Sequence, residues 1–413
     1  MPLVDMKDML THAYRNAYAV GGFDVVSLDF LEAIVAAAEH ARSPVILSLA
    51  ESHFEYYDFE LVMAAVEKAA QRCSVPIAIH LDHGASHESA VRAIRYGCNG
   101  VMVDASHENF TDNVARTRTV VEMAHACGIA VEGELGYVAG VEGEDAQKHP
   151  GETIYTSIKE AQLFVERTGV DFLAVSIGTV HGRVRGKPKL DFERLKRINE
   201  TLHIPLVIHG GTGLTDDQFR RLIGNGVSKI NYYTALADAA GACIRSVARD
   251  DRTCGYTGLT KGVRDAIRIE VEHCMVLWGS AGRAAEVLAQ CELWQPAHHV
   301  IAYNAAESSA SEVAAIMARG QEVLSEIPGV RRVVTGLAAQ ETSRFRYCWF
   351  IEFAHRKVID SYRDHPEHVA FANEVFRPVA NERVSLDFIA VEHAQQPTYD
   401  KFDFEVQASR RWA

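Results

Sequence analysis

The sequence predicts an α/β protein, in which a closed (β/α)8 barrel is followed by a small α+β domain. Three observations predict it: eight short apolar segments before residue 292, helical periodicity between them, and a different order of elements afterwards. Strands that are apolar throughout are typical of a parallel sheet covered by helices on both faces. Eight such cycles in a row favour a closed barrel, with an open sheet of the same elements as the alternative.

The expected barrel strands are short and recur at regular intervals. They span 18–23, 45–49, 77–81, 100–103, 129–133, 172–176, 206–208 and 229–231. Between them lie segments with helical periodicity, such as 31–41, 60–73 and 113–128. This alternation of strand and helix is what a parallel barrel requires.

After residue 292 the order of elements changes. We expect a strand over 298–305, a helix over 311–327, strands near 330–337 and 346–353, helical pieces over 355–362 and 366–377, and a strand over 384–391. This β-α-β-β-α-β order predicts a ferredoxin-like sandwich. The predicted division is a barrel over 1–292, an α+β domain over 297–394 and a tail over 395–413.

The composition limits the kinds of partner. The chain has 413 residues with Lys+Arg 42, Asp+Glu 55 and a formal net charge of −13. A surface this acidic repels phosphate backbones and anionic lipid, so we expect neither nucleic acid nor membrane as a partner. The eight cysteines form no C-x-x-C pair. Neither a signal peptide nor a membrane-spanning segment is expected, and the location predicted is a reducing compartment, the cytoplasm.

Three histidines fall where predicted strands end. His83 follows the third strand, His181 lies shortly after the sixth, and His209 closes the seventh. In a barrel these points lie on one rim, the C-terminal face. Three neutral imidazoles and one open position are the ligand set of a catalytic zinc ion. Since a single histidine among 19 is more often an ordinary hydrogen-bonded residue, the joint placement is what predicts the site.

Three acidic residues belong to the same rim. Asp82 precedes His83 and is expected to act as a general acid/base on a substrate hydroxyl, with capping of the following helix as the alternative. Glu132 and Glu134 close the fifth strand and share a face, because side chains two apart in a strand point the same way. One of them could bind the metal or support a metal-bound histidine, and a salt bridge with a barrel Lys or Arg is the alternative.

Glycine and hydroxyl residues on this rim predict a phosphate site. The loop Gly210-Gly211-Thr212-Gly213 follows the seventh strand, and Asn231 and Thr234 lie at the end of the eighth. Unblocked backbone N–H groups in these two loops are the usual phosphate cradle of a barrel. A glycine-rich loop alone is weak support, so its position carries the prediction.

The chain resembles the class II, zinc-dependent ketose-bisphosphate aldolases, the family of fructose- and tagatose-bisphosphate aldolases, from about residue 2 to 289. The matching motifs are RSPVIL (42–47), IHLDHG (79–84), EGELG (132–136), IGTVHG (177–182), VIHGGTG (207–213), KIN (229–231) and GSAGRA (279–284). The resemblance implies that His83, His181 and His209 bind catalytic zinc. It also implies that a ketose (bis)phosphate is cleaved to dihydroxyacetone phosphate and an aldehyde, or formed from them.

Further site residues follow from this resemblance. Asp82 would exchange a proton with the hydroxyl at the bond that is cleaved. Glu142, in GVEGED (140–145), matches a loop residue that shuttles the proton of the triose. The residues that match the triose-phosphate site, where a monovalent cation such as K⁺ or Na⁺ often helps, are Gly182, Gly210, Gly211, Thr212, Asn231 and Thr234.

The chain departs from the family pattern on the side of the aldehyde. Asp24 stands where Asn is usual, Ala50 where Ser is usual, and Tyr233 where an acidic residue is usual. The stretch Gly255-Tyr256-Thr257-Gly258 replaces D-P-R-K, whose Arg meets the distal phosphate. We therefore expect an altered aldehyde partner, unphosphorylated aldehydes included, with Asp24 among the substrate-binding residues.

The C-terminal part resembles the stress-responsive α/β-barrel (Dabb) domain through HHVIAY (298–303), HPEHVAF (365–371) and VSLDFIAVE (384–392). Such domains pair through their sheets, so a homodimer or homotetramer is expected. Two other functions remain open for the whole chain. One is a non-catalytic scaffold that binds a sugar phosphate, and the other is a metal-dependent sugar-phosphate epimerase.

Overall fold

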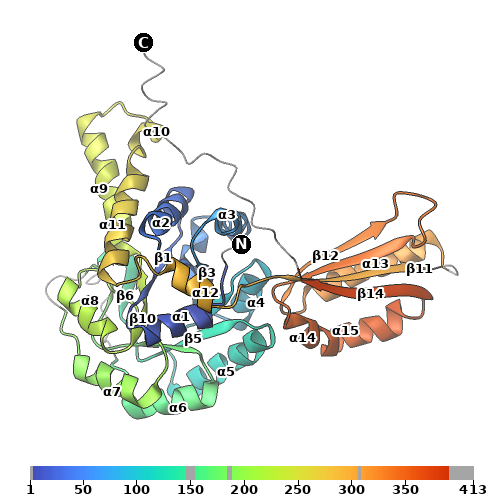
Figure 1. Cartoon of the computed structure of the whole chain (residues 1–413), viewed down its shortest axis with the longest axis horizontal. Helices are drawn as coiled ribbons and strands as arrows, with labels where there is room; N and C mark the ends of the chain where they lie inside the picture. The colour runs from blue at the N-terminus through green and yellow to red at the C-terminus, as the bar shows by residue number, and fades with distance from the viewer. Residues whose placement is uncertain (1–2, 146–153, 184–187, 306–307, 390–413) are drawn as a thin grey trace.

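The computed structural model describes residues 3–145, 154–183, 188–305 and 308–389, which form a larger and a smaller lobe (Figure 1). The larger lobe is a closed parallel barrel with the strand order β1-β10-β9-β7-β5-β4-β3-β2. The predicted (β/α)8 barrel is confirmed. The open sheet is wrong, because β1 pairs in parallel with both β2 and β10 and so closes the ring.

The barrel strands lie close to their predicted positions. They are β1 (Val20–Asp24), β2 (Val45–Ala50), β3 (Ile77–Gly84), β4 (Gly100–Val103), β5 (Ala130–Leu135), β7 (Phe172–Val175), β9 (Leu206–Ile208) and β10 (Val227–Tyr232). Outside the barrel, β6 (Gly140–Asp145) and β8 (His181–Arg183) pair in parallel with each other. The sequence did not predict this small ribbon, in which His181 is the first residue of β8.

Helices cover the outside of the barrel. They are α1 (Met6–Arg15), α2 (Leu28–Ala41), α3 (Phe59–Arg72), α4 (His87–Arg95), α5 (Phe110–Ala126), α6 (Ile158–Thr168), α7 (Phe192–Leu202), α8 (Asp216–Ile223), α9 (Thr234–Asp250), α10 (Tyr256–Leu259), α11 (Val263–Leu277) and α12 (Ala284–Gln290), with the 3₁₀ turn η1 (Glu51–Glu55). Side-chain caps such as Ser27 and Asp58 satisfy backbone N–H groups where helices begin. The α9 and α11 helices extend beyond the barrel, and α10 lies near their far end (Figure 1).

The interior of the barrel changes in character along its axis. Every residue of β2 and of β5 is buried, as expected for strands covered on both faces. Towards the C-terminal ends of the strands, the buried side chains include the acids Asp24, Asp82 and Glu132. Burying acids is costly unless they are paired, so this end of the barrel is where a functional site is expected.

The smaller lobe is an antiparallel sheet with helices on one face. Its strands are β11 (Ala297–Asn304), β12 (Val330–Leu337), β13 (Tyr347–Phe353) and β14 (Glu382–Ile389) in the order β12-β13-β11-β14, and its helices are α13 (Ala310–Ser325), α14 (Val358–Asp364) and α15 (Pro366–Ala370), followed by the π-helical turn η3 (Phe371–Phe376). This is the predicted β-α-β-β-α-β order. Trp349, Ile351 and Phe353 are buried on the face that the helices cover.

The lobes contact each other through a few specific pairs. Arg331 of β12 reaches Glu67 of α3 at 2.5 Å, and the ring of Trp294 stacks on His355 with centroids 4.3 Å apart. The smaller lobe therefore packs against the outside of the barrel near α3, and also near α4, whose Arg95 lies 3.3 Å from Glu326. Across the residues that the structure describes, no helix has both the length and the apolar character needed to cross a bilayer.

A buried aspartate at the N-terminal end of the barrel strands offers a test of the fold that is independent of the residues at the C-terminal ends. Asp171, at the start of β7, accepts hydrogen bonds from Lys7 Nζ at 2.7 Å, His125 Nε2 at 2.8 Å and the backbone N–H of Val131 at 2.8 Å. Burial by itself would raise the pKa of Asp171, but the hydrogen bonds from His125, Lys7 and Val131 lower it. The ionised form is therefore the one that the fold stabilises.

We expect Asp171→Asn to lower the free energy of unfolding at neutral pH by about 1–3 kcal/mol. Because the folded pKa lies below the unfolded value of about 4, this contribution is present above that pH and is lost as the pH falls through the folded pKa. Urea unfolding of both proteins at about pH 7 and about pH 3 measures it. A difference that does not shrink at the lower pH would contradict the assignment.

Candidate metal centre and active site

The structure brings the three predicted histidines together at the mouth of the barrel. His83 comes from the end of β3, His181 from β8, and His209 from the residue after β9. Their ring centroids lie 4.7, 5.1 and 5.8 Å apart. His83 Nε2 is 3.0 Å from His209 Nδ1, and one nitrogen of each ring lies within 4.8 Å of the others. These three residues could hold one metal ion.

Each ring uses its other nitrogen for a contact with an oxygen atom. The contacts are His83 Nδ1 to Asp104 Oδ2 at 2.8 Å, His209 Nε2 to Glu132 Oε1 at 2.9 Å, and His181 Nδ1 to the Val138 carbonyl at 3.2 Å. Metal-ligating histidines commonly donate their second N–H in this way, which fixes the tautomer and the ring orientation. The donor set therefore fits a zinc ion, with His83 Nε2 and His209 Nδ1 as metal-facing atoms.

Asp104 was not among the predicted site residues. It follows β4 directly and accepts two hydrogen bonds from Ser106, from the backbone N–H at 3.0 Å and the hydroxyl at 2.7 Å. Burial would raise the pKa of Asp104, but hydrogen bonds from His83 and Ser106 hold it below the ordinary range. Its position at the end of a strand is the same signal that revealed His83, and it could have been found that way.

Glu132 combines two roles that the sequence left as alternatives. Its Oε1 contacts His209, and its Oε2 accepts from Lys229 Nζ at 2.7 Å, with both side chains of this ion pair fully buried. Burial would raise the pKa of Glu132, but Lys229, and then His209, lower it to about 2. The carboxylate is therefore ionised, so it can accept the N–H of His209.

Asp82 lies beside the histidines and is fully buried. Both of its oxygens lie 2.7 Å from Asn231 Nδ2, which is also 3.4 Å from His209 Nδ1. Burial would raise the pKa of Asp82, but His83 and Lys229 outweigh it and hold that pKa well below its ordinary value. The alternative role as a helix cap is wrong, because Ser86 caps α4. Asp82 is thus available as a proton acceptor.

The charges around the three rings favour a divalent cation. Asp82, Asp104 and Glu132 are ionised, and two cationic groups balance them in part. Lys229 lies next to Glu132, and burial would lower the pKa of His83, but Asp82 and Asp104 raise it. Such a negative site attracts a cation and stabilises it. Glu134 differs, because burial and then the charge of Asp104 raise its pKa to about 7. It forms a second potential ligand group with His83 and Asp104.

The predicted phosphate residues lie around β8, β9 and β10. Gly210 has φ +71°, and a Cβ there would meet the Val180 carbonyl oxygen at 2.2 Å, so the loop after β9 packs on the backbone just before His181. Asn231 lies near the end of the neighbouring strand β10, and Thr234 begins the 17-residue helix α9. Gly182, Gly211 and Thr212 belong to the same segments. A helix N-terminus and a glycine loop beside the histidines are suited to a phosphate.

Two further predicted site residues, Glu142 and Asp24, lie on β6 and on β1. Glu142 lies in β6, whose residue Gly140 pairs with His181, but its side chain falls outside the described part of the chain. Asp24 ends β1 and is buried, and its Oδ2 lies 3.8 Å from His53 Nδ1. The Gly255–Gly258 stretch lies between α9 and α11, where Tyr256 is 78% exposed.

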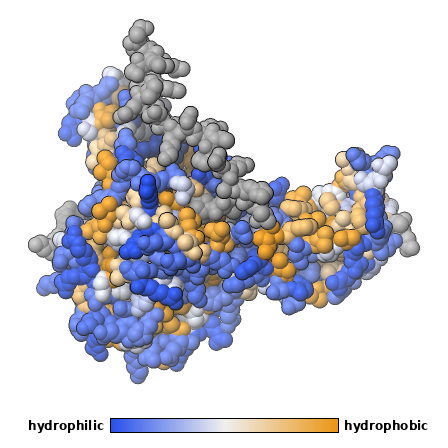
Figure 2. All heavy atoms as spheres, in the orientation of Figure 1, coloured by the Kyte–Doolittle hydropathy of each residue, from blue (hydrophilic) through white to orange (hydrophobic). Residues whose placement is uncertain are grey.

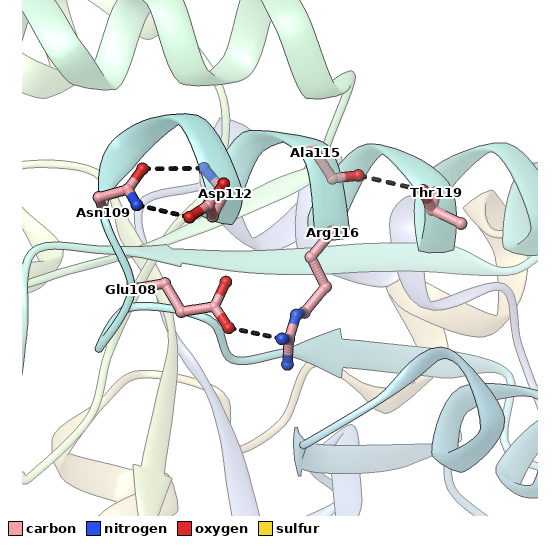
Figure 3. A pocket seen from close by; sticks show the side chains of 6 residues that line it. All are labelled: Glu108, Asn109, Asp112, Ala115, Arg116 and Thr119. Carbon is pink, nitrogen blue, oxygen red and sulfur yellow. Dashed lines mark hydrogen bonds and ion pairs between the residues drawn. The ribbon is translucent and has the colours of Figure 1, made fainter.

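A separate hollow of about 580 Å³ lies along α5 (Figure 3). Glu108 and Arg116 form an ion pair across it, and Asn109 accepts from the backbone N–H of Asp112 at 3.1 Å. None of the predicted site residues lines it. The polar groups around this hollow pair with one another, so we assign the hollow no part in the metal centre.

Comparisons with known proteins cover both lobes. Residues 4–283 match the family model described as class-II fructose-bisphosphate aldolase, and residues 297–390 match the model described as stress responsive A/B barrel domain. The fructose-bisphosphate aldolase of Geobacillus stearothermophilus is 43% identical over 290 residues, which cover 69% of this chain and 100% of that protein. The fructose-bisphosphate aldolase of Staphylococcus aureus is 40% identical over 288 residues, with the same coverage of 69% and 100%.

A solved structure shares the barrel as well. The YdjI aldolase of Escherichia coli matches with a TM-score of 0.59 and 33% sequence identity. The match covers 68% of this chain and 99% of that protein. The similarity therefore spans the whole of the related protein, and in this chain its extent corresponds to the barrel.

Asp104 provides a test of the metal centre that does not touch a ligand. We expect Asp104→Asn to weaken zinc binding by about 10–100-fold, because an amide supports His83 less well than a carboxylate does. Zinc retained per chain during titration with a competing chelator measures the affinity. The control is Asp112→Asn, which makes the same chemical change on α5. Unchanged affinity in Asp104→Asn would show that Asp104 does not support the metal site.

Proposed function

This chain belongs to the class-II fructose-bisphosphate aldolase family, and from that premise we propose that it is a zinc-dependent aldolase acting on a ketose phosphate. Dihydroxyacetone phosphate is one product and an aldehyde is the other. The observation that carries the proposal is the convergence of three imidazole nitrogens within 4.8 Å beside the buried carboxylate of Asp82. A metal site and a general base in contact with the same cluster are what this reaction needs.

We propose that His83, His181 and His209 hold the zinc ion. When bound, the ion supplies a Lewis acid that polarises the ketose carbonyl and stabilises the negative charge developed during cleavage. Asp104 and Glu132 keep the rings of His83 and His209 in place through contacts of 2.8 and 2.9 Å. Lys229 keeps Glu132 ionised.

The proton steps are assigned to two carboxylates. Asp82 takes the proton from the hydroxyl next to the bond that breaks, and the electrons of that O–H bond form the carbonyl of the aldehyde. The pair of electrons from the broken carbon–carbon bond remains on the triose, whose carbon then takes a proton from Glu142. In the reverse direction the triose carbon loses its proton and attacks the aldehyde, whose oxygen is protonated by Asp82. The lowered pKa of Asp82 keeps the side chain ionised, and only the ionised form can accept the proton in cleavage.

We assign the triose phosphate to the segments around Gly182, Gly210, Gly211 and Thr212 and to the start of α9. The N-terminus of a 17-residue helix and glycine backbone N–H groups favour an anion. A monovalent cation, K⁺ or Na⁺, is proposed to bind with the phosphate. Asn231 lies between this region and Asp82, to which its side-chain amide donates at 2.7 Å.

The aldehyde is proposed to differ from glyceraldehyde 3-phosphate. The positions that depart from the family pattern, Asp24, Ala50 and Tyr233, lie on β1, on β2 and just after β10, and Ala50 pairs in register with Asp82. The residues on the triose side follow the family pattern. The same triose chemistry would therefore serve a different partner.

Replacing Asp82 tests the proposed base. We expect Asp82→Asn to lower turnover by about 10²–10⁴-fold, because an amide cannot accept the proton, while zinc content stays the same. The assay is release of dihydroxyacetone phosphate from a panel of ketose phosphates. Asp216→Asn, an exposed residue on α8, is the control. Wild-type turnover by Asp82→Asn would contradict the assignment.

The same assay separates the other two functions. A scaffold releases no triose phosphate and loses nothing when zinc is removed by a chelator. An epimerase converts one ketose phosphate into another and gives no second fragment. Either result with the zinc-loaded protein would overturn the aldolase proposal.

We also propose that residues 297–394 form a separate domain, and that it pairs two copies of the chain. One face of its sheet is packed against helices, whereas the other carries Val384, Leu386 and Phe388, which are 41, 51 and 50% exposed. Val300 of β11 pairs in register with Leu386 of β14 on one side and with Phe350 of β13 on the other, so all three face the same side. Figure 2 shows apolar side chains over this lobe. An apolar sheet face suits a two-fold contact with the same face of a second copy.

Leu386→Asp tests the pairing. A charge in the middle of an apolar contact is costly to bury, so we expect the variant to have a smaller mass in solution than the wild-type homodimer or homotetramer. Light scattering coupled to size-exclusion chromatography measures this. The control is Glu374→Gln, on the far side of the domain in η3. An unchanged mass for Leu386→Asp would place the interface elsewhere.

A further inference from the structure

Four polar and aromatic residues line one side of the barrel mouth, next to Asp82. They are Asp24 at the end of β1, Ser48 on β2, His53 in η1 and Tyr233 after β10, and we call them the aldehyde wall. Asp24 pairs in register with Ser48, and Ala50, two residues on, pairs with Asp82. The aldehyde wall therefore lies within two strands of the proposed base, on the side where the chain departs from the family pattern.

Asp24 and His53, an acid and a base, form a buried pair within the wall. Asp24 is 1% exposed and His53 is 4% exposed, and Asp24 Oδ2 lies 3.8 Å from His53 Nδ1. The ring of Tyr233 packs on His53 with centroids 4.5 Å apart. The imidazole is thus held between a carboxylate and an aromatic ring. A carboxylate and an imidazole side by side can accept from, and donate to, a hydroxyl group.

Ser48, a member of the wall, supplies a hydroxyl group. Its Oγ is buried, and within the described residues it has no hydrogen-bond partner. Leaving a buried polar atom unpaired costs free energy, so such an atom at a site mouth indicates a ligand that pairs with it. A neutral hydroxyl group suits a ligand that itself carries hydroxyls.

The side chain of Asp24 is a poor partner for a phosphate. A carboxylate has no N–H to donate to a phosphate oxygen, whereas the side-chain amide of asparagine at the same position would donate. An arginine that meets a distal phosphate is also missing from the Gly255–Gly258 stretch.

We propose that the aldehyde wall selects a short, uncharged polyhydroxy aldehyde, with Asp24 and His53 binding its hydroxyl groups and Asp24 excluding an aldehyde phosphate. This rests on the proposed aldolase function and names the class of its second substrate. Asp24 accepts a hydrogen bond from a hydroxyl of the aldehyde, and His53 contacts the same or the neighbouring hydroxyl. The aldehyde carbonyl then lies towards Asp82, which protonates its oxygen when the new carbon–carbon bond forms.

The direct test measures condensation by the zinc-loaded, full-length protein. Dihydroxyacetone phosphate is supplied with glyceraldehyde, threose, propanal or glyceraldehyde 3-phosphate, and kcat/KM is compared. We expect the hydroxylated neutral aldehydes to exceed glyceraldehyde 3-phosphate by about tenfold or more, with propanal also below them because it lacks hydroxyls. A preference for glyceraldehyde 3-phosphate, or equal use of propanal and glyceraldehyde, would overturn the proposal.

Substitutions of Asp24 and His53 then test the roles proposed for these two residues. Asp24→Asn should shift the ratio of kcat/KM for glyceraldehyde 3-phosphate to that for glyceraldehyde upwards by about tenfold, because the new amide can donate to a phosphate where the carboxylate cannot. His53→Gln should lower kcat/KM for glyceraldehyde by about fivefold to tenfold and leave propanal less affected. Asp265→Asn, whose side chain is 76% exposed on α11, should leave both ratios unchanged. A ratio that does not move in Asp24→Asn would overturn the role of that residue.

A measurement made without any aldehyde distinguishes a failure of the aldolase proposal from a failure of the inference about the aldehyde wall. An aldolase exchanges a carbon-bound proton of dihydroxyacetone phosphate with D₂O even when no aldehyde is present, and NMR follows this exchange. Exchange combined with a preference for phosphorylated aldehydes would overturn the inference about the wall alone. No exchange would overturn the aldolase function, and the inference with it.

Discussion

The buried ion pair between Lys229 and Glu132 is the interaction on which the arrangement of the site depends. Its two side chains are fully buried and lie 2.7 Å apart. A buried charge without a partner is strongly destabilising, so each side chain requires the other. Because Lys229 keeps Glu132 ionised, the second carboxylate oxygen can accept from His209 Nε2, which leaves Nδ1 to face His83. One pair in the barrel core thereby fixes which nitrogen of His209 faces the proposed metal ion.

The general plan of the molecule could be predicted from the sequence, because it follows from periodicity and topology. The eight barrel strands and the β-α-β-β-α-β order were predicted, and the comparisons confirm both family resemblances. The convergence of His83, His181 and His209 was predicted because parallel strands bring their ends to one rim. The ribbon of β6 and β8 was missed, because short strands outside a barrel have no periodic signal. The pairing of Lys229 with Glu132 was left open, because sequence spacing does not say which interior side chains face each other across a barrel.

The two halves of the mouth are built differently. Around the histidines, carboxylates are paired with donors at 2.7–2.9 Å, as the proposed metal site requires. On the side proposed to bind the aldehyde, Asp24 and His53 are 3.8 Å apart, and the buried hydroxyl oxygen of Ser48 has no hydrogen-bond partner among the described residues. In the proposed function, the half around the histidines performs the chemistry and the other half selects the aldehyde, so that one fold can serve different aldehydes.

The proposed activity depends on a metal ion held by three imidazoles. X-ray absorption spectroscopy of the purified, zinc-loaded protein tests this most directly, since it reports the atoms bound to the ion. We predict one zinc ion per chain with three imidazole nitrogens at about 2.0–2.1 Å and an oxygen in the remaining position. A coordination shell of sulfur, or one that keeps three imidazoles after His209→Ala, would contradict it.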